Sequence, residues 1–207
     1  QALKSRQFSI TFVLLLIAGW SWSFFGTALR GQEIYYSAEG PFMFIGYFFI
    51  LAFPLLVVVP FGAYRSISVE REDRTYELLS ITTLAPRQII SGKLASAVIQ
   101  MIIYLSAISP CLAFTYLLRG LDFLTILLLI TYTVLGSLAL SLLAILAGTV
   151  TTQKHWQAIL SVAIIAGLGA AFFFACGMAV TFASQESLPV GHDEFWQVNA
   201  LIFTIYA

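Results

Sequence analysis

Residues 65–93 read RSISVEREDRTYELLSITTLAPRQIISGK, a polar stretch that separates two long apolar segments. The stretch holds nine charged residues, in a chain with only 10 Lys and Arg and 10 Asp and Glu in all. Because hydrocarbon does not accommodate so many charges, the stretch is expected to lie in water between two membrane spans. Glu70 and Arg74 are four residues apart, which favours an ion pair on a helix, and Pro86 suits the first turn of another helix. We therefore expect a short surface helix, a break, and a helix that leads into the next span.

The composition of the whole chain agrees with a membrane protein. Hydrophobic residues make up 60% of it, charged residues 10%, and its mean hydropathy is +0.93. Such values are typical of proteins that cross the membrane several times. The formal net charge is zero, which gives no support for nucleic-acid binding through bulk charge.

The apolar segments predict an all-α membrane protein, a polytopic helix bundle that forms a single domain. A span needs about 20 apolar residues. Five segments reach that length, and a sixth begins before the sequence stops. The predicted spans are residues 8–29, 42–64, 94–118, 123–150 and 156–183, with 198–207 as the truncated sixth.

The positions of Lys and Arg predict which end faces the cytoplasm. With the N-terminus inside, Arg30 and Arg119 fall outside, and the other eight basic residues fall on the cytoplasmic side. This asymmetry follows the positive-inside rule, so a cytoplasmic N-terminus is expected. The inner set is Lys4, Arg6, Arg65, Arg71, Arg74, Arg87, Lys93 and Lys154.

Three prolines and one row of small residues stand out within the spans. Pro54, Pro60 and Pro110 are expected to kink their helices, and the carbonyls they free must find partners in the bundle. They serve either to shape the helices or as gating hinges. The fifth span carries small residues in steps of four, which lets another helix approach closely, within the subunit or in a dimer. That row includes Gly167, Ala171 and Ala175.

Residues for chemistry are scarce in this sequence. No Asp, Glu, Lys, Arg or His lies deep in a span, which argues against an ion-coupled pump and favours an energy source outside the membrane part. No phosphate-binding G-x-x-x-x-G-K-[ST] loop occurs. His192, Asp193 and Glu194 are clustered, but their spacing is poor for a metal, so neither a metal site nor a catalytic site is predicted.

The segment from Glu70 to Leu94 resembles the cytoplasmic signature of ABC-2 type transporter permeases. Members of that family commonly show a pattern near E-R-E-x-G-T-L-E-x-L-L-x-T-P-L-S-R-x-E-x-x-x-G-K-L between spans two and three. Arg74 replaces the usual Gly, Tyr76 replaces a Leu, and Thr83 stands where Pro is frequent. The matching residues are Glu70, Arg71, Glu72, Thr75, Glu77, Leu78, Leu79, Thr82, Leu84, Gly92, Lys93 and Leu94.

The resemblance implies a permease subunit of an ABC transporter, an exporter in the inner (plasma) membrane of a bacterium. Such subunits pair with a second permease, as a homodimer or heterodimer, and with ATPase subunits that hold the ATP and Mg. The chain itself would then be no enzyme and would hold no cofactor. Its helix 70–79 would couple to the ATPase through Glu70, Arg71, Glu72, Arg74, Thr75, Glu77, Leu78 and Leu79.

Two other interpretations remain open from the sequence. The chain could be a membrane scaffold or anchor that transports nothing and assembles through the small residues of span five. It could also be an intramembrane enzyme, although that would require a catalytic His or acid beyond the residues given. The substrate and the direction of transport do not follow from the residues.

Overall fold

The structure is a computed structural model that describes residues 6–31, 40–72, 86–118, 120–150 and 154–184, together with Gln197 and Ala200. Within these ranges the chain is almost entirely helical and contains no strand. The elements in chain order are α1 (Arg6–Arg30), α2 (Gly40–Phe53), the π-helix η3 (Pro54–Val58), α3 (Val59–Glu72), α5 (Pro86–Leu117), α6 (Phe123–Val150) and α7 (Lys154–Ser184).

Among the described residues, five helical stretches are long and apolar enough to cross a membrane, which agrees with the five predicted spans. They are residues 7–30, 40–69, 90–117, 123–149 and 157–183. The second stretch comprises α2, η3 and α3, which follow one another without interruption. The predicted sixth span, 198–207, lies almost wholly outside the described residues, and which side the N-terminus faces stays a prediction.

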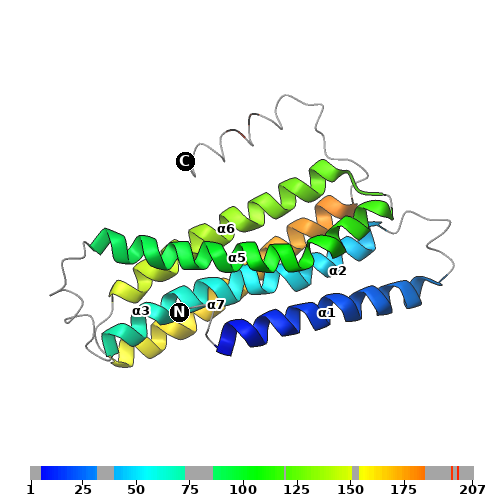
Figure 1. Cartoon of the computed structure of the whole chain (residues 1–207). Coiled ribbons are helices and arrows are strands. Elements are labelled where there is room, and N and C mark those ends of the chain that lie inside the picture. The colour runs from blue at the N-terminus through cyan, green and yellow to red at the C-terminus, as the bar shows by residue number, and fades with distance from the viewer. Residues whose placement is uncertain are drawn as a thin grey trace.

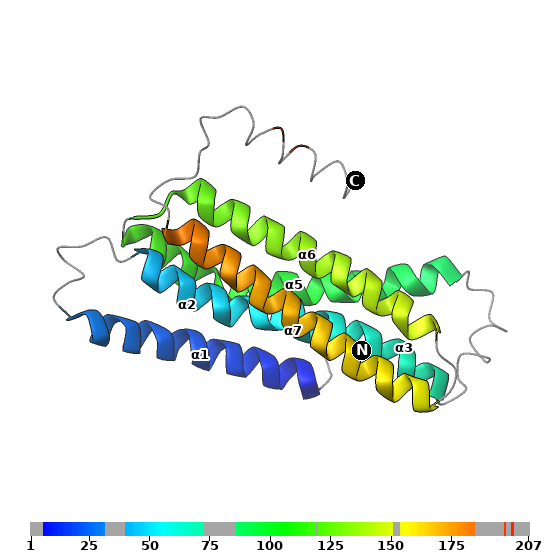
Figure 2. The same ribbon diagram turned by 180° about the vertical axis from the view of Figure 1, so that it is seen from behind.

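Helix α2 is the centre of the bundle. It packs against α1, α5 and α7, while its continuation α3 packs chiefly against α6. Figures 1 and 2 show α1 along one edge and α6 along the other, with α2 and α3 between them. The ends of α3 and α6 and the beginnings of α5 and α7 gather at one end of the bundle, so the described parts of the polar stretch, residues 65–72 and 86–93, lie at that end.

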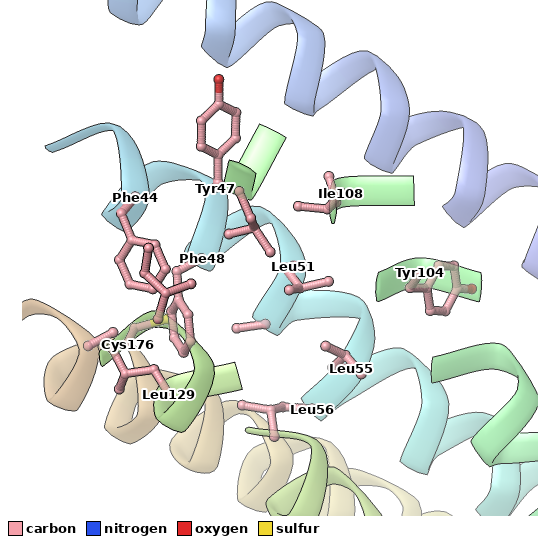
Figure 3. Close-up of a cluster of buried hydrophobic side chains, with 14 of the residues drawn as sticks. Phe44, Tyr47, Phe48, Leu51, Leu55, Leu56, Tyr104, Ile108, Leu129 and Cys176 are labelled. Atoms are coloured by element: carbon pink, nitrogen blue, oxygen red, sulfur yellow. The ribbon is translucent and has the colours of Figure 1, made fainter. Parts of the chain in front are cut away.

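Large side chains of α2 fill the space between the helices. Phe44, Tyr47, Phe48 and Leu51 are each at most 2% exposed. Figure 3 shows these side chains fanning out from α2 toward its neighbours, with the Tyr47 hydroxyl directed at α1. Because lipid is as apolar as these residues, tight packing and not the exclusion of water holds the bundle together.

Two glycines allow α1 and α2 to approach closely. The indole ring of Trp22 on α1 lies directly over Gly46 on α2, where it occupies the space a Cβ atom would take. The ring is fixed there because its Nε1 donates a hydrogen bond to the Met43 carbonyl at 3.2 Å. One turn further along α1, a Cβ on Gly26 would come within 2.6 Å of the Met43 sulfur. Glycine at position 46 is therefore a condition of this helix pair, whereas a Cβ at position 26 would meet only the flexible end of the Met43 side chain.

Helices α3 and α6 are joined by a second row of small residues. Ser137, Ser141, Ala144 and Gly148 are all buried and recur at intervals of four, three and four residues along one face of α6. A Cβ on Gly148 would lie 3.4 Å from both the Ile67 side chain and the Tyr64 carbonyl. The backbones thus come close at the end of the bundle that carries the polar stretch.

Candidate functional site

Helix α3 extends the second span directly into the polar stretch. The sequence predicts that this span ends at Tyr64, but the helix continues to Glu72, and its apolar part ends at Val69. Nothing between these residues breaks a helix, and Ile67 and Ser68 are still buried against the bundle. Glu70, Arg71 and Glu72 thus form the last turn of α3. The remaining predicted coupling residues, Arg74, Thr75, Glu77, Leu78 and Leu79, lie outside the described residues.

Within the polar stretch, α5 begins at Pro86, as the sequence predicts. A lysine on α5 holds its first turns against α3. The Nζ atom of Lys93 donates hydrogen bonds to the Ser66 carbonyl at 2.9 Å and to the Ser66 hydroxyl at 3.1 Å. Because bonds from a charged donor are about twice as strong as neutral ones, this contact joins the helix that enters the stretch to the one that leaves it.

Helix α7 supplies a second attachment of α3 at the same end. The side-chain amide of Gln157 donates a hydrogen bond to the Ser68 carbonyl at 3.4 Å. The backbone carbonyl of Gln157 accepts a hydrogen bond from the Tyr64 hydroxyl, also at 3.4 Å. These bonds are long, so each is weak. The Ser68 hydroxyl is buried and has no partner among the residues described. Ser66, Ser68, Lys93 and Gln157 thus form a polar junction, named here the α3 root, at the base of the predicted coupling segment.

The predicted hinge in span two coincides with a change of helix type. Pro54 is the first residue of η3, where the bonds run from residue i+5 to residue i; accordingly, the Val59 N–H bonds to the Pro54 carbonyl. In an α-helix that N–H would serve Leu55 instead. The next nitrogen belongs to Pro60, which has no hydrogen to donate. The Leu55 carbonyl is therefore left without a backbone donor.

A serine from α6 satisfies this carbonyl. Ser137 lies 82 residues further along the chain, is fully buried, and donates its hydroxyl to Leu55 O. Carbonyls freed by proline in membrane helices generally find such partners on neighbouring helices. The requirement for a partner inside the bundle is thus met, and Ser137 is the residue that meets it. Whether Pro54 and Pro60 act as a hinge stays a prediction.

We expect Ser137→Ala to destabilise the bundle by about 1 kcal/mol, because a buried carbonyl loses its donor. The midpoint of thermal unfolding in detergent, followed by circular dichroism, measures this loss. Ser141→Ala is the matched control: Ser141 is equally buried one turn away, but its hydroxyl bonds to the Ser137 carbonyl of its own helix. Equal losses in both variants would contradict the role assigned to Ser137.

The other predicted hinge and the small-residue row occupy exposed or half-exposed positions. Pro110 lies inside α5, which continues past it to Leu117, and its side chain is exposed.

On α7, a Cβ on Gly167 would meet nothing within 4 Å, whereas Ala171 and Ala175 are half-buried. Toward its C-terminal end the row becomes buried, with Ala179 at 0% exposure. The row therefore packs inside the subunit only at one end.

No family model, curated protein or solved structure matches this chain. In the part of the chain that the structure covers, no three His, Cys, Asp or Glu side chains form a group that could hold a metal. The cluster 192–194 lies outside that part. The function must therefore be argued from the residues and their geometry.

Sequence reasoning did not anticipate the α3 root. Lys93 reads as an ordinary lysine at a helix edge, and its reach across to Ser66 depends on how α3 and α5 pack. Gln157 is an isolated polar residue near the start of an apolar run, and that is a weak signal. A polar side chain within the first turn or two of a span is worth testing for a contact with the neighbouring helix.

Proposed function

We propose that this chain is the permease subunit of an ABC transporter, of the ABC-2 type, and that it exports its substrate. Residues 70–79 form the coupling segment that docks on a separate ATPase. The protein lies in a bacterial inner membrane with its N-terminus and this segment in the cytoplasm. A second permease subunit completes the translocation path.

The α3 root is the observation that carries the proposal. A segment that receives force from a partner must be attached stiffly to the helices it moves. Here α3 runs unbroken from the membrane to Glu72, and Lys93 and Gln157 attach it to α5 and α7. A passive loop on lipid headgroups needs no such attachment. The charges of residues 70–77 would set the register on the partner more than the affinity for it.

A scaffold without transport activity is the alternative, favoured by one observation. Gly167 is exposed on α7 with no neighbour within 4 Å, although glycine is a poor helix former. A second helix could approach closely there. Such assembly would need no nucleotide.

Co-purification with an ATPase tests the proposal. We would express the chain with the ATPase encoded beside it, reconstitute the complex in lipid, and measure ATP hydrolysis with and without the permease. The expected result is a stable complex whose hydrolysis rate differs from that of the ATPase alone. If no ATPase binds while the chain still self-associates, the coupling proposal fails and the scaffold is favoured.

Lys93→Met is expected to weaken the α3 root by about 1.5 kcal/mol, because two bonds from a charged donor are lost while the aliphatic stem stays in place. In the complex, ATP hydrolysis should persist while transport per ATP falls. Ser91→Ala is the matched control, since the exposed Ser91 hydroxyl bonds only within its own helix, to Gln88. Unchanged coupling in Lys93→Met would show that the root does not transmit the movement.

A further inference from the structure

A cleft opens on the side of the bundle between α1 and α5, with α2 as its floor. It has a volume of about 280 Å³, close to the ~300 Å³ lower bound of small-molecule sites. Trp20 of α1, 75% exposed, and Phe114 of α5, 38% exposed, line it and face outward. Because the three helices are apolar and long enough to cross a membrane, the cleft opens to lipid. Lipid-soluble molecules can therefore enter it from the side.

Three hydroxyl groups line this otherwise apolar cleft, those of Ser23, Thr27 and Tyr47. Ser23 donates its single proton to the Gly19 carbonyl at 2.9 Å. The 2.6 Å bond between Ser23 and Tyr47 must therefore use the proton of Tyr47. Thr27 donates to the carbonyls of Ser23 at 2.8 Å and Phe24 at 3.0 Å.

All three hydroxyl protons are thus spent inside the protein, while the oxygens of Thr27 and of Ser23, the latter beside the Cys111 thiol, keep lone pairs. A cleft that offers acceptors and few donors suits a ligand that donates a hydrogen bond.

The depth of Ser23 in the membrane further restricts the chemical class of the ligand. It lies seven residues before Arg30, about 10 Å along the helix from the end of α1. A phospholipid would have to bring its charged phosphate to that depth, and burying an unpaired charge is costly. A hydroxyl without a charged headgroup can enter at a much lower cost.

We propose that the cleft between α1 and α5 binds a neutral lipid alcohol, a long apolar molecule with one free hydroxyl. The hydroxyl donates to Ser23 Oγ, and the apolar body lies along Ile108, Trp20 and Phe114. This proposal is independent of the coupling to an ATPase, because the cleft involves neither the polar stretch nor the α3 root.

The two cysteines provide the test. Cys111 lines the cleft and is half-exposed, whereas Cys176 is 2% exposed in the core. The full chain is placed in phosphatidylcholine nanodiscs, and the rate at which N-ethylmaleimide labels Cys111 is measured by mass spectrometry. The probes are 1-tetradecanol, its methyl ether and tetradecane. Cys176 reports whether the fold stays intact.

Tetradecanol is expected to half-protect Cys111 at a roughly fivefold lower mole fraction than its methyl ether, the effect of one neutral hydrogen bond. The ether cannot donate, so it should resemble tetradecane. In Ser23→Ala the advantage of the alcohol should vanish. Tyr47→Phe is the matched variant: it also removes one hydroxyl but frees a lone pair on Ser23, so the alcohol should keep its advantage.

Equal protection by all three probes would overturn the proposal and leave a cleft for acyl chains alone. Protection by tetradecanol that persists in Ser23→Ala would overturn the assigned acceptor. A rise in Cys176 labelling in Ser23→Ala would set that variant aside, and the comparison of tetradecanol with its methyl ether in the wild type would then decide the proposal.

Discussion

Gly46→Ala is expected to destabilise the bundle by about 3 kcal/mol, at the upper end of the usual cost of overpacking. The added methyl group would occupy the space that the Trp22 indole fills. That ring cannot easily turn away, because Nε1 bonds to the Met43 carbonyl and the ring contacts Phe42 at a centroid distance of 5.5 Å. Helix α1 would have to move away from α2. The midpoint of thermal unfolding in detergent measures the effect.

Gly62→Ala is the matched control for this prediction. Gly62 lies in α3 of the same long helix, and a Cβ there would meet nothing within 4 Å. Alanine favours the helix by about 1 kcal/mol over glycine, so this variant should be as stable as the wild type or more stable. Adding Trp22→Ala to Gly46→Ala should restore part of the loss, as expected for two residues in direct contact. Without such rescue, the steric explanation is wrong.

Reversing two charges in the coupling segment is expected to abolish ATP-driven transport while the bundle stays folded. Under the proposed function, Glu70→Lys with Glu77→Lys would place like charges against a partner selected for the opposite sign. Such juxtapositions cost several kcal/mol, enough for a loss of at least about 100-fold in coupled activity. Transport into proteoliposomes and ATP hydrolysis by the same complex are the two measurements.

Asp122→Lys controls for charge reversal as such. Asp122 is exposed in the connection between α5 and α6, at the opposite end of the bundle. That variant should transport at the wild-type rate. If the double reversal also transports normally while the ATPase remains bound, residues 70–79 do not couple the two proteins.

The span pattern was predictable because apolar length alone determines it. The fourth predicted span, 123–150, has the bounds of α6, and Pro86 begins α5 as expected from its missing N–H. The helix extends beyond the predicted end of the second span, because hydropathy falls at Arg65 while the helical hydrogen bonds do not stop there. Hydropathy reports where the lipid ends, and the backbone continues as a helix to Glu72.

The contacts between helices could not be predicted from the sequence. The sequence shows that Pro60 must leave one carbonyl without a backbone donor. It does not show that η3 makes Leu55 the residue that lacks the donor, or that Ser137 supplies the missing hydrogen bond, because both depend on how α6 packs. The rows of small residues on α6 and α7 look alike in the sequence. Only the first is buried along its whole length, since a row of small residues permits close approach but does not specify a neighbour.

The bond from Ser137 to Leu55 also bears on how the protein is made. Trp22 and Met43, which join α1 to α2, are 21 residues apart, whereas Ser137 follows Leu55 by 82. At a synthesis rate of about 5–20 residues per second, the second bond waits roughly 4–16 s for its donor to emerge from the ribosome. During that interval the η3 segment has an unsatisfied carbonyl that lipid cannot bond. Between the pairing of α1 with α2 and the synthesis of α6, the Leu55 carbonyl therefore needs a temporary hydrogen-bond donor. The insertion machinery or water is the source of that donor until Ser137 is made.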